Sequence, residues 1–93
     1  MTIFSKSAFK HGVTAEQMDD VLRSEYSEIF DEGFDRTGHY SAIYVGFDSQ
    51  GNLLEVKAKF ILLTTSDDDN THVFHADKAT TKYRRLFNQK KGK

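Results

Sequence analysis

The sequence predicts a single α+β domain over residues 1–93, with a helix or helices at its N-terminus, an antiparallel sheet of three to four strands and a C-terminal helix. Three observations carry this prediction: a helix-capping motif at Thr14, two strand-like stretches joined by a glycine-containing turn, and an apolar stripe at helical spacing near the C-terminus. A chain of 93 residues forms one core, because separate cores arise only in much longer chains. We expect a two-layer arrangement of helices on the sheet.

The first helix is expected from residue 15 to about residue 24. The segment Thr14–Gln17 has the capping-box pattern, in which a Thr hydroxyl and a Gln side chain each bond an exposed backbone N–H group. Val13 and Met18 stand where a hydrophobic staple would join them across the helix start. A short helical turn around Ser5–Lys10 is expected to precede this helix.

The middle of the chain predicts a long antiparallel hairpin. Residues Tyr40–Phe47 have the aromatic and β-branched content of a strand, and residues 48–52 form a polar, glycine-containing turn. From Leu54 onward, apolar residues alternate with charged ones, which is the pattern of a strand with one buried face. The charged positions of that alternation are Glu55, Lys57 and Lys59.

Shorter elements complete the expected order. Residues 26–30 are interpreted as a short strand or an irregular helix extension, 31–38 and 64–70 as loops, and 71–76 as a third strand. Asp77 is expected to cap the last helix, because its carboxylate suits both the free N–H groups and the helix dipole. The apolar stripe by which that helix faces the sheet consists of Ala79, Tyr83, Leu86 and Phe87.

Charge is divided unevenly along the chain, although the net charge is −1. Residues 1–77 carry all fourteen acidic residues and six Lys or Arg, a net charge of −8. Residues 78–93 carry seven Lys or Arg and no acidic residue, a net charge of +7. Such a basic end is expected to meet phosphates or an acidic protein surface. Its last residues, 90–93, are interpreted as a disordered tail.

The composition excludes several kinds of site. Without cysteine, the chain can form neither a disulfide nor a thiolate metal site. It has no apolar run of about 18 residues and no signal-peptide core, so we expect a cytoplasmic protein without membrane contact. His72 and His75 are expected on opposite faces of one strand, and residues 67–70 lack the remainder of a calcium-binding loop. We therefore expect no metal and no cofactor.

Three collinear segments, Lys10–Val13, Gly46–Val56 and His72–Leu86, resemble the BrnT family of toxins. Members of that family, including its divergent relatives, show a Lys-His-Gly-Val start, a Gly…Gly-x-Leu-Leu hairpin and an Ala-x-x-Ala-Thr final helix. Here the segments read KHGV, GFDSQGNLLEV and HVFHADKATTKYRRL, and the region from the first to the last covers most of the chain. The resemblance implies a RelE-like fold, metal-independent cleavage of RNA, and neutralisation by a cognate antitoxin bound in a hetero-oligomer.

Cleavage of RNA without a metal requires a base for the 2′-hydroxyl, an acid for the leaving oxygen and a cation for the developing phosphorane charge. His75 is the strongest candidate, because imidazole titrates near neutral pH and this residue ends a strand beside the basic helix. A structural role at the sheet edge is its alternative. Lys10 and His11 match the start of the family motif, although His11 could instead stabilise a helix C-terminus. Arg36, which resembles the family's Arg before its first long strand, could clamp a phosphate or pair with a nearby acid.

The last helix supplies the candidate RNA-binding residues, whereas its Tyr83 is interpreted as part of the core. The candidates are Lys78, Lys82, Arg84 and Arg85, which could follow a nucleic-acid backbone in a salt-sensitive way. An alternative function is a non-catalytic RNA- or protein-binding module of the same fold. The acidic body favours this alternative, because RNA would be repelled from most of the surface outside a focused groove.

Overall fold

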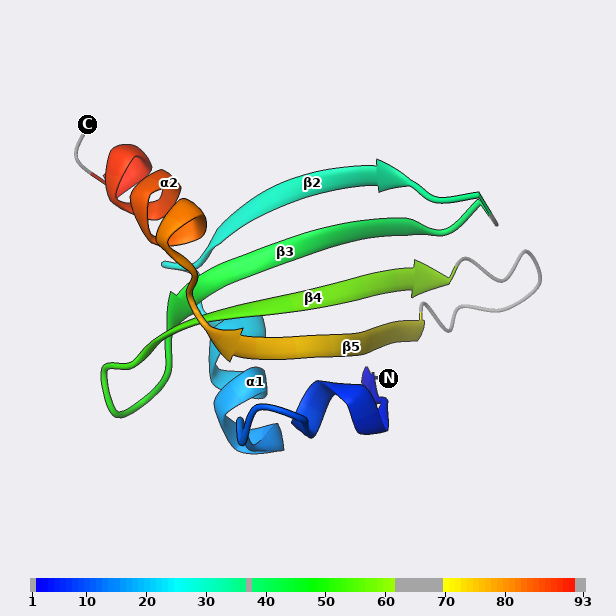
Figure 1. The fold of residues 1–93 in the computed structure, drawn as a ribbon, viewed down its shortest axis with the longest axis horizontal. Coiled ribbons are helices and arrows are strands. Elements are labelled where there is room, and N and C mark those ends of the chain that lie inside the picture. Colours follow the sequence, from blue (N-terminus) through cyan, green and yellow to red (C-terminus); the bar gives the residue numbers. More distant parts are fainter. Residues whose placement is uncertain (1, 37, 62–69, 92–93) are drawn as a thin grey trace.

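The computed structural model describes residues 2–36, 38–61 and 70–91, and these residues form a five-stranded sheet with two α-helices and a short 3-10 helix (Figure 1). The elements in chain order are β1 (Thr2–Phe4), η1 (Lys6–Phe9), α1 (Ala15–Arg23), β2 (Glu28–Phe34), β3 (Tyr40–Phe47), β4 (Leu53–Ile61), β5 (Asn70–Lys78) and α2 (Thr81–Lys91). The strands lie in the order β1-β5-β4-β3-β2. The α+β class is confirmed.

The sheet is mixed rather than wholly antiparallel. Strands β2 to β5 pair antiparallel, as expected, but β1 pairs in parallel with β5 and places Thr2 opposite Thr71. The Ser5 N–H continues this pairing by donating to the Val73 carbonyl at 2.9 Å. The prediction of an antiparallel sheet of three to four strands is wrong at this edge, because a three-residue strand is too short to show an alternating pattern.

The N-terminal helical region agrees with the sequence prediction. The Thr14 hydroxyl accepts from the Gln17 N–H at 3.1 Å, while the Gln17 side chain accepts from the Thr14 N–H at 2.8 Å. Val13 and Met18 are both buried in one cluster beneath the sheet, as the staple predicts. The expected helical turn before α1 is η1, and Gly12, with φ of +81°, allows the chain to turn from η1 towards α1.

The two α-helices cover opposite faces of the sheet. Alternate residues of β3 and β4, such as Tyr44 and Val56, pack with α1, whereas Ile43, Val45 and Leu53 pack with α2. The sheet is therefore the middle of three layers, and the expected two-layer arrangement is wrong. The run Leu53–Val56 is buried on both faces because a helix lies over each.

Strand β2 extends into residues expected to form a loop. It continues through Phe34 by means of a bulge between Asp31 and Gly33, where Gly33 has φ of +80°. Most of the acidic segment 64–70, interpreted as a loop, lies outside the described residues, and its last residue, Asn70, begins β5. The result is a long β2–β3 hairpin at one side of the sheet (Figure 1).

Strand β5 is longer than expected, and two predictions about its residues are wrong. It continues through Lys78, so Asp77 lies in the strand and does not cap α2, which begins at Thr81. A bulge at Phe74 places Val73 opposite Ala58 but His75 opposite Lys57. Because His72 lies opposite Lys59, His72 and His75 lie on the same face of the sheet and not on opposite faces.

Helix α2 extends further than expected, because it includes Lys90 and Lys91. Their ammonium groups lie 3.9 Å and 3.4 Å from the carboxylate of Glu28, which joins the end of α2 to β2. Residues 92 and 93 of the expected tail lie outside the described part of the chain. None of the described helices is long and apolar enough to cross a membrane.

Candidate catalytic site

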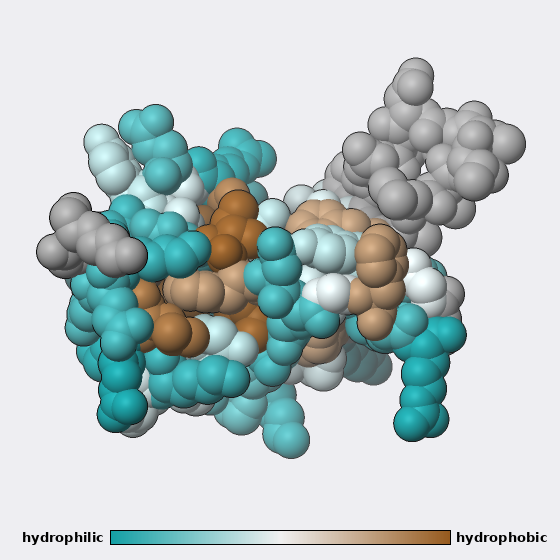
Figure 2. Space-filling view, turned by 90° about the horizontal axis from the view of Figure 1, so that it is seen from above, coloured by the Kyte–Doolittle hydropathy of each residue, from teal (hydrophilic) through white to brown (hydrophobic). Residues whose placement is uncertain are grey.

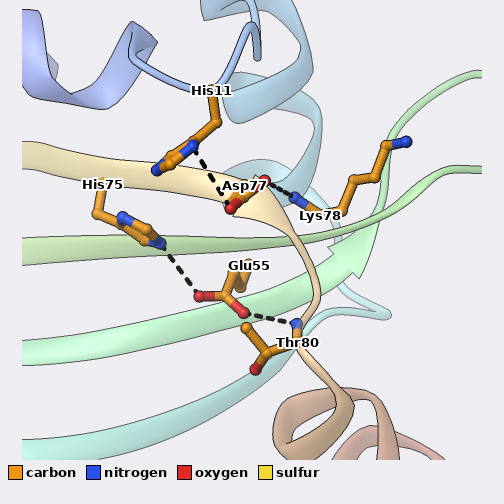
Figure 3. Close-up of polar contacts among 6 residues, drawn as sticks. All are labelled: His11, Glu55, His75, Asp77, Lys78 and Thr80. Atoms are coloured by element: carbon orange, nitrogen blue, oxygen red, sulfur yellow. Dashed lines mark hydrogen bonds and ion pairs between the residues drawn. The ribbon is translucent and has the colours of Figure 1, made fainter.

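A buried carboxylate, Glu55, lies between the sheet and the start of α2 (Figure 3). Only 3% of this residue is exposed. One of its oxygens, Oε1, accepts from the Thr80 N–H at 2.7 Å, and the other, Oε2, lies 3.1 Å from Nε2 of His75. Both oxygens therefore have a partner, which compensates for the loss of hydration on burial.

The contact with Glu55 orients the imidazole of His75. An ionised carboxylate can only accept hydrogen bonds, so when Glu55 is ionised this contact requires a hydrogen on Nε2 of His75. In the neutral ring the lone pair is then on Nδ1. The His75 side chain is 28% exposed, so a ligand can reach it.

His11 contributes a second imidazole to the site. It lies in the segment between η1 and α1, and its ring is 5.5 Å from that of His75, in an edge-to-face arrangement (Figure 3). Its Nδ1 is 3.6 Å from Oδ2 of Asp77, close enough for an ion pair when His11 is protonated. The fold thus brings together two candidate residues from opposite ends of the chain, each beside a carboxylate.

Two exposed lysines adjoin the site residues in the chain. Lys78 follows Asp77 at the end of β5 and is exposed, and its backbone N–H donates to Oδ1 of Asp77 at 2.7 Å. Lys10 is exposed and immediately precedes His11. No ion pair involves either ammonium group within the described residues. Lys78 lies opposite Leu54, on the other face of the sheet from Glu55 and Asp77, so its side chain is directed away from the two imidazoles (Figure 3).

Arg36 is not part of this cluster. It is exposed in the β2–β3 connection, beyond the pair of Phe34 and Tyr40, whereas His75 is at the level of Lys57 and three strands away. His72 shares the face of His75 but lies further from α2, opposite Lys59. No group of three or more His, Asp or Glu among the described side chains could hold a metal ion.

The basic residues of α2 form a separate surface beside the site. Lys82, Arg84 and Arg85 are exposed, and a depression of about 430 Å³ is lined by Thr81, Arg84, Arg85, Asn88 and Gln89. Tyr83, by contrast, packs towards the sheet with its ring 5.8 Å from that of Phe30, as predicted for a core residue. Burial, and then the charges of Glu32 and Glu55, raise the pKa of Tyr83, so its phenol stays protonated at neutral pH.

Glu55 and Asp77 are the members of the site that the sequence does not predict. The alternating pattern assigns Glu55 to an open face, and only the unbroken run Leu53–Val56 indicates burial on both faces. Asp77 is expected at a helix start, whereas it lies in β5 beside His11. The burial of Glu55 and the position of Asp77 within β5 both depend on where α2 begins and on how it packs against the sheet.

The chain has been compared with models of known protein families and with curated protein sequences, and neither comparison gives a match.

Proposed function

We propose that this chain is a metal-independent endoribonuclease whose acid and base are His11 and His75. The observation that carries the proposal is the separation of 5.5 Å between the two rings, each of which has its own carboxylate. Two imidazoles in this arrangement can supply both proton transfers of RNA cleavage without a cofactor. We further propose, from the resemblance, that it is the toxin of a type II toxin–antitoxin system in the cytoplasm, held inactive by a bound antitoxin.

The proposed reaction transfers the phosphoryl group of the cleaved bond from the 5′-oxygen of the following nucleotide to the neighbouring 2′-oxygen. A neutral imidazole takes the proton of the 2′-hydroxyl, and the 2′-oxygen attacks the adjacent phosphorus. The bond from phosphorus to the 5′-oxygen breaks, and a protonated imidazole gives that oxygen a proton. The products are a 2′,3′-cyclic phosphate and a 5′-hydroxyl end.

The carboxylates favour one assignment of roles. Glu55 holds the Nε2 hydrogen of His75, which leaves the Nδ1 lone pair to act as the base. His11, whose Nδ1 lies 3.6 Å from Oδ2 of Asp77, is assigned the role of the acid. Lys10, which is exposed and next to His11 in the chain, adds a positive charge that attracts the phosphate.

A non-catalytic RNA-binding module is the second candidate function. The observation that favours it is the exposed cationic set on α2, Lys82, Arg84 and Arg85, which forms no ion pair with other described residues. In that case Glu55 and His75 would only fasten β4, β5 and the start of α2 together.

Two oligonucleotides that differ only in one 2′-hydroxyl group distinguish the two functions. A short RNA with a single cleavable position and its 2′-deoxy counterpart are incubated with the protein in excess chelator. Cleavage of the RNA alone, with cyclic phosphate at the new 3′ end, is the expected result. Retention of both oligonucleotides without cleavage would support the binding module, and cleavage of both would exclude the proposed mechanism.

A further inference from the structure

Strand β2 is the outer strand of the sheet and has a free edge. Within the described residues it pairs with β3 alone, from Glu28 opposite Val45 to Phe34 opposite Tyr40. The backbone groups along its outer edge therefore have no strand partner in the described chain. A seven-residue edge of this kind can receive an extended peptide as an additional strand.

Apolar side chains are exposed beside this edge. Ile29 is 48% and Phe34 is 72% exposed, and both lie on the face of the sheet that α1 covers only in part. The Phe34 ring is 5.3 Å from that of Tyr40, which is 6.2 Å from that of Phe60, so a row of rings crosses three strands. Figure 2 views the molecule from the β2 side and shows apolar side chains among the hydrophilic ones. Adjacent exposed apolar groups of this size are typical of a surface that is covered by a partner.

The same stretch of β2 is acidic. Asp31 and Glu32 are exposed, and neither forms an ion pair with a described Lys or Arg. Asp31 interacts with the hydroxyl of Tyr40, and this hydrogen bond is the main reason that the pKa of Tyr40 is raised. At the other end of β2, Glu28 is paired with Lys90 and Lys91. The chain therefore neutralises one end of the strand and leaves the other negative.

This charge selects the kind of partner. Two β2 strands paired antiparallel about their centres would bring Asp31 and Glu32 against the same acids of the second copy, and like charges in opposite positions destabilise strand pairing. RNA would be repelled for the same reason. Arginine or lysine, by contrast, can pair with Asp31 and stack on the ring of Phe34, which lie on one face of the sheet, and can also pair with Glu32 at the bulge.

We propose that the β2 surface, defined as Ile29, Asp31, Glu32, Phe34 and Tyr40, binds an extended basic segment of a partner protein as a sixth strand. Main-chain hydrogen bonds to β2 would hold the segment, and its cationic side chains would supply the selectivity. The inference does not depend on ribonuclease activity, because no residue of the β2 surface belongs to the histidine site.

Two blocked peptides of about ten residues test this inference, one alternating arginine with valine and one alternating glutamate with valine. Each is titrated into the full chain while amide chemical shifts and hydrogen exchange are followed by NMR. The arginine peptide is expected to slow exchange at β2 amides, with an affinity that falls as salt increases, whereas the glutamate peptide is expected not to bind. Glu32→Lys should weaken binding of the arginine peptide about fivefold, and Glu16→Lys, the matched change on α1, should not.

Several results would overturn the proposal. Equal binding of the two peptides would remove the electrostatic selectivity, and unchanged affinity in Glu32→Lys would remove the role of that acid. Binding without protection of β2 amides would place the peptide elsewhere. Concentration-dependent protection in the free protein would assign the edge to a second copy, and protection by a short RNA would assign it to nucleic acid.

Discussion

Glu55 on β4 and His75 on β5 are joined across the sheet by a contact of 3.1 Å between Oε2 and Nε2. The other oxygen of the same carboxylate accepts the N–H of Thr80, the residue immediately before α2. The orientation of the imidazole is therefore tied to the position at which α2 leaves the sheet. In the proposed ribonuclease, Glu55 is a positioning residue, because it acts on RNA through His75.

Replacing the carboxylate tests that role. In Glu55→Gln, the amide group cannot accept at both of its ends, so either His75 or Thr80 loses its acceptor. We expect RNA cleavage to fall at least about tenfold. We also expect ¹⁵N NMR to show that the hydrogen of His75 is no longer confined to Nε2.

The matched control is Glu25→Gln, which changes an exposed carboxylate in the same way. Unchanged cleavage and an unchanged imidazole spectrum in Glu55→Gln would contradict the positioning role. Loss of cleavage in a protein whose His75 spectrum stays unchanged would indicate a purely structural role for Glu55.

Asp48, in the turn between β3 and β4, should make stability depend on pH. Burial alone would raise its pKa, but hydrogen bonds from Asn52, Gln17 and Gln50 outweigh burial and lower the pKa to about 2. Because the folded state lowers the pKa from 3.8, the charged form adds stability above about pH 4, and this contribution is lost as the pH falls towards about 2. The charge of Asp48 therefore contributes about 2 kcal/mol to the free energy of unfolding.

Urea unfolding of the wild type and of Asp48→Asn, at about pH 5.5 and about pH 2, measures this contribution. The wild type is expected to exceed the variant in free energy of unfolding by about 2 kcal/mol at the higher pH, and the difference should shrink at the lower pH. A difference that does not change with pH would contradict the assignment of the effect to the Asp48 charge.

Gly46 on β3 is required by the close approach of the segment that follows α1. A Cβ atom at this position would lie 2.0 Å from Oγ and 2.9 Å from Cβ of Ser27, whose hydroxyl is fixed by donation to the Val21 carbonyl at 2.7 Å. Gly46→Ala should therefore lower the free energy of unfolding by about 2 kcal/mol, measured by urea unfolding. Ser41→Ala on the same strand is the control. Equal stability of the two variants would show that Ser27 moves away from an added Cβ at position 46 at little cost in free energy.

The cationic set on α2 should govern RNA affinity rather than chemistry. Binding of a 2′-methoxy RNA, which cannot be cleaved by the proposed route, is followed by fluorescence anisotropy at several salt concentrations. Arg84→Gln and Arg85→Gln should each lower affinity and reduce the slope of log K against log salt by about 0.7. Lys91→Gln, whose ammonium group is paired with Glu28, should have a smaller effect. Identical salt slopes for the three variants would show that RNA does not contact this surface.

The sequence predicts those parts of the fold that local interactions determine. Two such parts are the capping box at Thr14 and Gln17 and the β3–β4 hairpin. Each depends on residues that are near neighbours in the chain, so the sequence pattern alone predicts it. The strand β1 is not predictable in this way, because its three residues are held by β5, far along the chain. The layer order is missed for a similar reason, since it depends on which face α2 covers.

The candidate site is predicted only in part. His11 and His75 are identified from chemistry and from motif resemblance, but their proximity depends on how the segment after η1 packs against β5. The bulge at Phe74, which sets the face on which His72 lies, leaves no pattern that distinguishes it from a regular strand. Burial of Glu55 depends on the end of β5 and the start of α2, which the sequence places too early.

The most direct test of the proposed activity is the rate of cleavage of a short RNA in excess chelator by the wild type, His75→Ala and His72→Ala. His72 is the matched control, because it lies on the same strand and the same face of the sheet. We expect cleavage by the wild type and by His72→Ala, and a rate at least about a hundredfold lower for His75→Ala. Equal rates for the wild type and a folded His75→Ala, or no cleavage by the folded wild type, would contradict the assignment of ribonuclease activity to this site.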